Sequence, residues 1–171
     1  MVEVGILMGS DSDWPKLKAV GEALDQFGVG YEVRVLSAHR TPHKVAEYAS
    51  TAAGRGIKVL IAAAGGAAHL AGVVAAHTTL PVIGIPVLTD ALGGLDSLLS
   101  MVQMPGDVPV ATVAVGGGGP RNAGLLAVQI LALSNPGLQE KLVAFKKQLV
   151  EKVESRDAAL QATLSKSQLG K

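Results

Sequence analysis

The sequence contains no cysteine, which excludes disulfide bonds, thiol catalysis and cysteine-ligated metal sites. Only 3% of its 171 residues are aromatic, so the core must be built from smaller aliphatic side chains. The 21 glycines indicate close approach between backbone segments, because glycine carries no Cβ. With 49% hydrophobic residues, the chain is long enough to bury one core. We expect a single α/β domain over residues 1–171, with a C-terminal helical arm at about 136–165.

Runs of like charge are absent as well. The net charge is +1, and no basic block is interleaved with aromatic residues, so the sequence does not favour a nucleic-acid partner. We therefore expect a small-molecule ligand. The first residues, Met1–Val4, lack the basic stretch and the apolar run of a signal peptide. A cytoplasmic location is the resulting expectation.

Asp, Glu, Lys and Arg are all absent between Lys58 and Asp90, which on hydropathy alone resembles a membrane span. The internal order of this stretch favours a buried β-α-β unit instead. A short β-type run is interrupted by Gly65 and Gly66, and a second such run lies between two prolines. We therefore expect no membrane segment. The mean hydropathy of +0.38 is high for a monomer, and contacts between subunits would cover the surplus apolar surface.

The same alternation of strand and helix patterns extends along the chain. Strands are expected at Val4–Met8, Glu32–Val35, Val59–Ala62, Val82–Ile85 and Ala111–Val115. The first helix is expected to follow Asp13 and to stop at Gly28 and Gly30. Further helices are expected from Thr41-Pro42 onward, and at Ala67–Ala76, Leu95–Val102, Asn122–Leu133 and Leu138 to about Thr163. This order predicts a doubly wound parallel five-stranded sheet in three α/β/α layers. Such sheets bind ligands beyond the carboxyl ends of their strands.

Three polar loops follow the first three strands, at residues 9–13, 37–41 and 64–69. A glycine-rich turn that enters a helix presents free N–H groups and the positive end of the helix dipole, which suit a phosphate or a carboxylate. Ser10 and Ser12 add hydroxyl donors to the first loop. The loops therefore predict a site for a small anionic ligand.

The charged residues and the glycines of these loops each allow two interpretations. Asp13 is suited to ribose hydroxyls, or it only caps the first helix. Arg40 would supply the cation that a phosphate needs, although an arginine just before a helix is more often solvated. Gly65 and Gly66 allow close approach of a ligand, or they only let a helix pack on a strand.

Two of the four histidines lie in the polar loops. His39 follows a strand end, where an imidazole can exchange a proton near neutral pH. His69 lies in an apolar sequence, where a histidine is more often a packed or surface group. His43 and His77 fall within helices and are interpreted as structural.

No metal site is predicted, because no histidine pair with a carboxylate occurs in these loops. No phosphate-binding P-loop motif is present, and residues 116–119 lack the order of a dinucleotide fingerprint.

Four stretches carry a resemblance to a known family. They are Met8–Trp14 (MGSDSDW), Ser37–Pro42 (SAHRTP), Ala64–Leu70 (AGGAAHL), and Asp96–Ser100 (DSLLS) with Gln103–Pro105 (QMP). In this order they resemble the class I 5-(carboxyamino)imidazole ribonucleotide mutase family of purine biosynthesis, over roughly residues 3–133. The related carboxylase branch, which uses free carbon dioxide, typically has lysine after Ser-Ala-His and a Gly-Arg-Ser-Asn type third loop. Arg40 and residues 66–69 favour the mutase branch.

The resemblance implies a flavodoxin-like sheet and an octamer with active sites near subunit contacts. It implies an isomerase without a cofactor, which moves a carboxyl group from the exocyclic nitrogen of its ribonucleotide substrate to ring carbon C4. The product, 4-carboxy-5-aminoimidazole ribonucleotide, belongs to the route to IMP. An ATP-dependent synthetase that makes the labile substrate would be a functional partner.

The resemblance also implies roles for individual residues. It implies that Ser10, Asp13 and Arg40 contact the ribose phosphate, with Ser12, Ser37 and Ala38 beside them, and that His39 carries the proton. In the third loop, Gly65, Gly66, Ala67, Ala68 and Leu70 would confine the released carbon dioxide. His69 is expected among the substrate-binding residues, with no defined role. The chain departs from the family pattern at Ala63, where glycine is frequent, at Ala71, where proline is usual, and at Pro120-Arg121, where the family has a small pair.

Two alternatives stay open at this point. The first is an aminoimidazole ribonucleotide carboxylase that depends on free carbon dioxide. The second is a flavodoxin-like module that binds a phosphoryl ligand without catalysis. A receiver-type module would need an aspartate after the third strand and a lysine after the fifth, where this chain has Ala64-Gly65 and Gly116-Gly117. A flavin protein would be yellow as purified.

Overall fold

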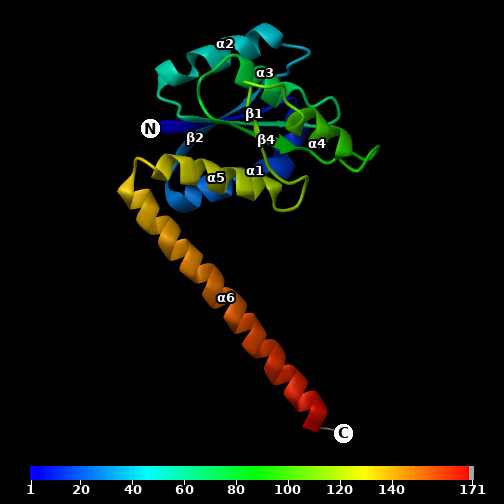
Figure 1. Ribbon diagram of the computed structural model, residues 1–171, viewed down its shortest axis with the longest axis vertical. Helices are drawn as coiled ribbons and strands as arrows, with labels where there is room; N and C mark the ends of the chain where they lie inside the picture. Colours follow the sequence, from blue (N-terminus) through cyan, green and yellow to red (C-terminus); the bar gives the residue numbers. More distant parts are fainter. Residues whose placement is uncertain (170–171) are drawn as a thin grey trace. The chain divides into compact units, whose positions relative to one another are not determined.

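The computed structural model describes residues 1–169 and the side chains of residues 1–165. The described residues form two compact units. The first, Met1–Leu131, contains a sheet with helices on both faces. The second begins at Ala132 and consists mainly of helix α6, Pro136–Leu169, which is drawn from yellow to red in Figure 1. Among the described residues, no helix is long and apolar enough to cross a membrane.

The sheet has five strands. They are β1 (Val2–Met8), β2 (Gly30–Val35), β3 (Val59–Ala64), β4 (Val82–Pro86) and β5 (Ala111–Thr112). Their order is β2-β1-β3-β4-β5, and every neighbouring pair is parallel, which confirms the predicted doubly wound sheet. All residues of β3 and β4 are buried. The two strands of the stretch without charges therefore lie in the interior of a sheet covered on both faces, with α3 between them in the chain.

Helices cover both faces of this sheet (Figure 1). They are α1 (Trp14–Phe27), α2 (Pro42–Ala52), α3 (Leu70–Ala76), α4 (Leu95–Val102) and α5 (Gly119–Ala132), with short 3-10 helices η1 (Asp11–Asp13) and η2 (Ala53–Arg55). Helices α2 and α3 lie on one face, and α1 and α5 lie on the other. On the α2 and α3 face, Met101 of α4 joins the core formed with Leu7, Leu60 and Val74.

Glycines set the helix ends and the helix packing. Helix α1 ends at Gly28, whose φ of 73° lies in the left-handed region, as the sequence predicts. Where α1 and α5 meet, a Cβ on Gly124 would lie 2.8 Å from both the carbonyl oxygen of Val20 and the Cβ of Ala23. Glycine at position 124 therefore permits the two helices to approach this closely.

Several element boundaries differ from the predicted ones, and β5, α3 and α6 are three examples. Strand β5 pairs over two residues instead of five, because Pro86 of the neighbouring strand has no N–H with which to extend the ladder. Helix α3 begins at Leu70 instead of Ala67, because Gly66 is left-handed (φ 67°) and the N–H groups of Ala68 and His69 donate to carbonyl oxygens only two residues back, which is not the helical pattern. Helix α6 extends further at both ends than the predicted Leu138–Thr163.

Candidate active site

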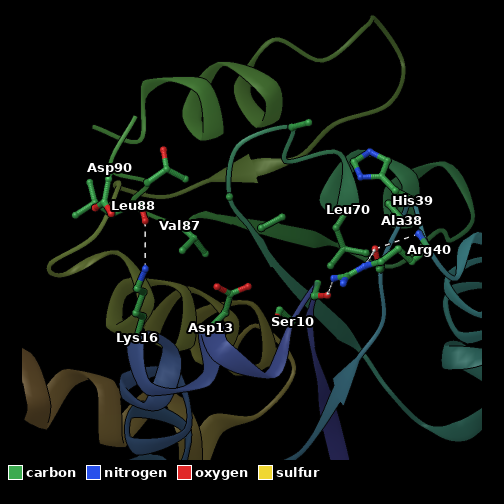
Figure 2. A pocket seen from close by; sticks show the side chains of 16 residues that line it. Ser10, Asp13, Lys16, Ala38, His39, Arg40, Leu70, Val87, Leu88 and Asp90 are labelled. Carbon is green, nitrogen blue, oxygen red and sulfur yellow. Dashed lines mark hydrogen bonds between the residues drawn. The ribbon is translucent and has the colours of Figure 1, made fainter. Parts of the chain in front are cut away.

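A cleft of about 730 Å³ lies at the carboxyl ends of β1, β2, β3 and β4 (Figure 2). The strand order reverses direction between β1 and β3, so the loops that follow these two strands diverge and leave a crevice. Nine of the predicted site residues line the cleft, namely Ser10, Asp13, Ser37, Ala38, His39, Arg40, Gly65, Ala67 and Leu70. Ser12, Gly66, Ala68 and His69 are not part of its lining.

The first loop is shaped by hydrogen bonds between its own residues. Ser10 caps helix η1, and its Oγ accepts from the Ser12 N–H at 3.3 Å. The two serine hydroxyls lie 2.8 Å apart. Ser12 therefore supports Ser10, which lies at the base of the cleft in Figure 2.

Asp13 precedes helix α1, but its side chain makes no capping hydrogen bond. The carboxyl group lies beside Ser10 in the cleft (Figure 2). Burial raises the pKa of Asp13 above its usual range, and the nearby Lys16 ammonium partly opposes this shift. The capping interpretation of Asp13 has no support in this geometry, and its two oxygens are placed to accept hydrogen bonds from a ligand.

The second loop holds Arg40 against the first. Ser37 Oγ accepts from the Arg40 N–H at 3.2 Å, and the Thr41 hydroxyl donates to the Ser37 carbonyl oxygen at 3.1 Å. The guanidinium Nη2 of Arg40 donates to the Gly9 carbonyl oxygen at 2.7 Å. A charge-assisted bond of this length fixes the cation at the edge of the cleft.

The third loop is held from behind by helix α4. Ser97 is fully buried; its hydroxyl accepts from the Gly66 N–H at 2.9 Å and donates to the Val87 carbonyl oxygen at 2.7 Å. Gly66 therefore supports the loop rather than facing the cleft, and Ala68 is buried. Within residues 1–169, no hydrogen bond is made by the N–H groups of Gly65 and Ala67, both of which line the cleft. These two groups are open donors.

His39 and His69 are in direct contact. His39 Nε2 and His69 Nδ1 lie 2.8 Å apart, with ring centroids 4.9 Å apart and an interplanar angle of 84°. His39 lines the cleft on the same side as Arg40 and Leu70 (Figure 2). The structure therefore pairs the two loop histidines, although only one of them borders the cleft.

Sequence reasoning missed a fourth loop and one lysine. The cleft is also lined by Gly9, Lys16, Ala64, Val87, Leu88, Thr89 and Asp90. Lys16 lies across the cleft from Arg40 in Figure 2, and its Nζ donates to the Leu88 carbonyl oxygen at 3.3 Å. Two features of the sequence could have indicated these residues: Thr89 and Asp90 are the first polar residues after β4, and Lys16 follows Asp13 by one helical turn.

Among residues 1–169, no three histidine, aspartate or glutamate side chains converge to hold a metal ion.

The comparison with protein families identifies the chain. A family model described as AIR carboxylase matches residues 3–152. The chain belongs to the AIR carboxylase family. This confirms the resemblance carried by the four motifs.

Relatives within the AIR carboxylase family cover nearly the whole chain. A Vibrio vulnificus protein is 58% identical over 152 residues, which cover 89% of this chain and 94% of the relative. A Mycobacterium tuberculosis protein is 57% identical over 163 residues, which cover 95% and 92%. Both are named N5-carboxyaminoimidazole ribonucleotide mutase. The crystal structure of Treponema denticola PurE is 28% identical with a TM-score of 0.85, and the match covers 94% of this chain and 99% of that one.

Proposed function

We propose that this family member is a 5-(carboxyamino)imidazole ribonucleotide mutase of purine biosynthesis. It moves a carboxyl group from the exocyclic nitrogen of the substrate to ring carbon C4. The observation that carries the proposal is a single cleft in which a proton-exchanging residue, His39, lies beside a fixed cation, Arg40. Relatives that are 53–58% identical to this chain carry the mutase name.

The ribose phosphate binds between the first two loops. Arg40 supplies positive charge and Ser10 a hydroxyl donor, and both line the cleft. The carboxyl group of Asp13 accepts hydrogen bonds from the ribose hydroxyls, which are donors that a carboxylate suits better than a phosphate. Ser37 and Ala38 form the wall beside Arg40, and Ser12 keeps Ser10 in place.

The reaction needs one group that gives a proton and later takes one back. His39 protonates the exocyclic nitrogen as the bond from nitrogen to the carboxyl carbon breaks and carbon dioxide leaves. Ring carbon C4 then attacks the carbon dioxide, and His39 removes the proton from C4. The proton that His39 gives to the exocyclic nitrogen is replaced by the proton that it takes from C4, and no electrons are gained or lost overall. The conversion therefore requires no cofactor.

The third loop confines the carbon dioxide between the two steps. Gly65, Ala67 and Leu70 line the cleft with small or apolar surface, which suits a small apolar molecule. The open N–H groups of Gly65 and Ala67 are placed to stabilise the carboxylate as its charge develops. Gly66, Ala68 and His69 support this wall from outside the cleft.

We also infer the cellular setting of the enzyme. We expect a homo-octamer in the cytoplasm, with residues 1–171 acting as one catalytic domain that carries its helical arm. Its labile substrate comes from an ATP-dependent synthetase. Exposed apolar side chains after β4 and on α4 support subunit contacts: Leu88, Leu92, Leu95, Leu99 and Val102 are each 47–63% exposed.

Isotope retention tests the proposed reaction. Substrate labelled in its carboxyl carbon is converted in unlabelled bicarbonate, in a reaction short enough that spontaneous decarboxylation is small. A mutase recaptures the released carbon dioxide before it escapes, so most of the label appears in the product, and added bicarbonate does not accelerate turnover.

Two other outcomes would replace the proposal. Product that carries mainly carbon from the solvent would show that free carbon dioxide is the substrate, and the chain would then be a carboxylase. Binding of the nucleotide without any turnover would indicate a binding module.

A further inference from the structure

The contact between His39 and His69 gives the two rings unequal roles. Only His39 lines the cleft, whereas His69 reaches it through His39. The short distance, 2.8 Å, joins Nε2 of His39 to Nδ1 of His69. In the part of the chain that the structure describes, residues 1–169, Nδ1 of His39 makes no hydrogen bond. Of the two nitrogens of His39, Nδ1 is therefore the one left to meet a substrate.

A hydrogen bond between two imidazole nitrogens contains one proton, and its position decides what His39 can do. If His69 donates, neutral His39 carries its own proton on Nδ1 and cannot accept another there. If His69 accepts, neutral His39 carries its proton on Nε2 and presents a bare Nδ1. Only the second arrangement lets Nδ1 both give and take a proton while Nε2 keeps its bond to His69.

We propose that His69 is a positioning residue for the mutase reaction: its Nδ1 holds Nε2–H of His39, so that Nδ1 of His39 is the atom that carries the proton. This inference rests on the proposed function. The Nδ1 proton of cationic His39 passes to the exocyclic nitrogen as that nitrogen takes the electron pair of the bond that breaks. Carbon C4 then bonds to carbon dioxide, and its proton returns to Nδ1. The bond to His69 is unchanged throughout.

Paired substitutions at position 69 test the role. The leucine variant H69L removes the acceptor, and we expect kcat to fall about 10- to 100-fold, less than the 10²- to 10⁴-fold typical of losing the acid/base itself. KM should stay within about threefold of wild type, because His69 does not line the cleft. The asparagine variant H69N places Oδ1 near the former Nδ1, and its kcat should stay within about fivefold of wild type. The matched control is H77L, the same change at the other end of α3.

The double variant H39N/H69L separates positioning from a structural effect. If His69 acts through His39, adding H69L to H39N lowers kcat no further, and the double variant has the same kcat as H39N alone. A further loss of the same size as in the wild-type background would overturn the proposal. So would equal losses in H69L and H69N, or a loss that appears in KM.

A measurement without substrate keeps this inference distinct from the proposed function. The tautomer of each neutral histidine can be determined from two-bond ¹H–¹⁵N correlations in protein labelled with ¹⁵N-histidine. We expect neutral His39 to be the Nε2–H tautomer in wild type and H69N, and to include the Nδ1–H tautomer in H69L. The same tautomer of His39 in all three proteins would show that His69 does not hold Nε2. If wild type and H77L fail to convert the nucleotide, the proposed function is wrong, and this role in its reaction falls with it.

Discussion

Among single residues, Arg40 combines a structural contact with a predicted binding contact. Its guanidinium already donates to the Gly9 carbonyl oxygen, and its own N–H is held by Ser37. A guanidinium has five N–H donors in a planar arrangement, so several remain for a phosphate after the bond to Gly9 is made. The same bond positions the cation before any ligand arrives.

Replacing Arg40 with alanine should weaken substrate binding. A hydrogen bond to a charged group contributes about 1.5–3 kcal/mol, so we expect KM for the nucleotide to rise about 10- to 150-fold, with a smaller change in kcat. Steady-state kinetics of R40A measure this. The control is R34A, because Arg34 is an exposed arginine of β2 outside the cleft.

The dephosphorylated nucleoside makes the test specific to the phosphate. Wild type should use the nucleoside poorly, and R40A should use it about as well as wild type does. If R40A loses as much activity on the nucleoside as on the nucleotide, then Arg40 acts by shaping the loops and not by binding phosphate.

Residue types in the loops could be predicted from the sequence, but their pairing could not. His39, Arg40 and Ser10 follow strand ends, and parallel strands bring such loops to one edge. The contact between His39 and His69 depends on the distance between two loops 30 positions apart, which no local pattern contains. Ser97 was part of a recognised motif, yet its bonds to Gly66 and Val87 are visible only in the folded chain.

For the secondary-structure elements, the hydrophobic patterns and the signals for element ends differed in how well they predicted the structure. Helix α4 has the predicted bounds, and α1 ends at the predicted Gly28. Strand β5 is shorter than its apolar run, because a strand's length also depends on the donors of its neighbour, and Pro86 lacks one. Hydrophobic patterns therefore predicted which elements exist, whereas contacts between elements set several of their ends.

The contact between α1 and α5 gives a prediction about stability. In G124A the new methyl group would meet the Val20 carbonyl oxygen and the Ala23 side chain, both at 2.8 Å, so one helix must shift. Overpacking of this kind costs about 1–3 kcal/mol. Urea unfolding, at one protein concentration for all variants, should show this loss. In the control G54A no atom lies within 4 Å of the new methyl, and we expect a change within about 0.5 kcal/mol. Equal midpoints for G124A and wild type would contradict the close packing.

For the whole molecule, we expect assembly into an octamer. The apolar side chains exposed after β4 and on α4 lie next to the cleft, since Leu88 belongs both to this surface and to the cleft lining. Apolar groups gathered in this way favour burial between subunits. An octamer would place several such surfaces together.

Light scattering at micromolar concentration tests the octamer. We expect a mass about eight times the 17.4 kDa of the chain, and a smaller mass for L99E, which places a charge on α4. The exposed Val143 of α6 provides the control V143T, which adds no charge and should leave the mass unchanged. A stable wild-type monomer would refute the expected assembly and leave the exposed leucines unexplained.

The position of β1 in the middle of the sheet has a consequence for how the chain folds during synthesis. Strand β1 leaves the ribosome first, but its partner on one side is β3, where Val4 pairs with Val59, 55 positions later. At about 5–20 residues per second, translation needs roughly 3–11 s to supply that partner. Until then, β1 pairs only with β2, and its other edge offers unpaired N–H and C=O groups in an apolar strand. Nascent chains that stall before residue 59 should therefore be the ones that aggregate or recruit chaperones.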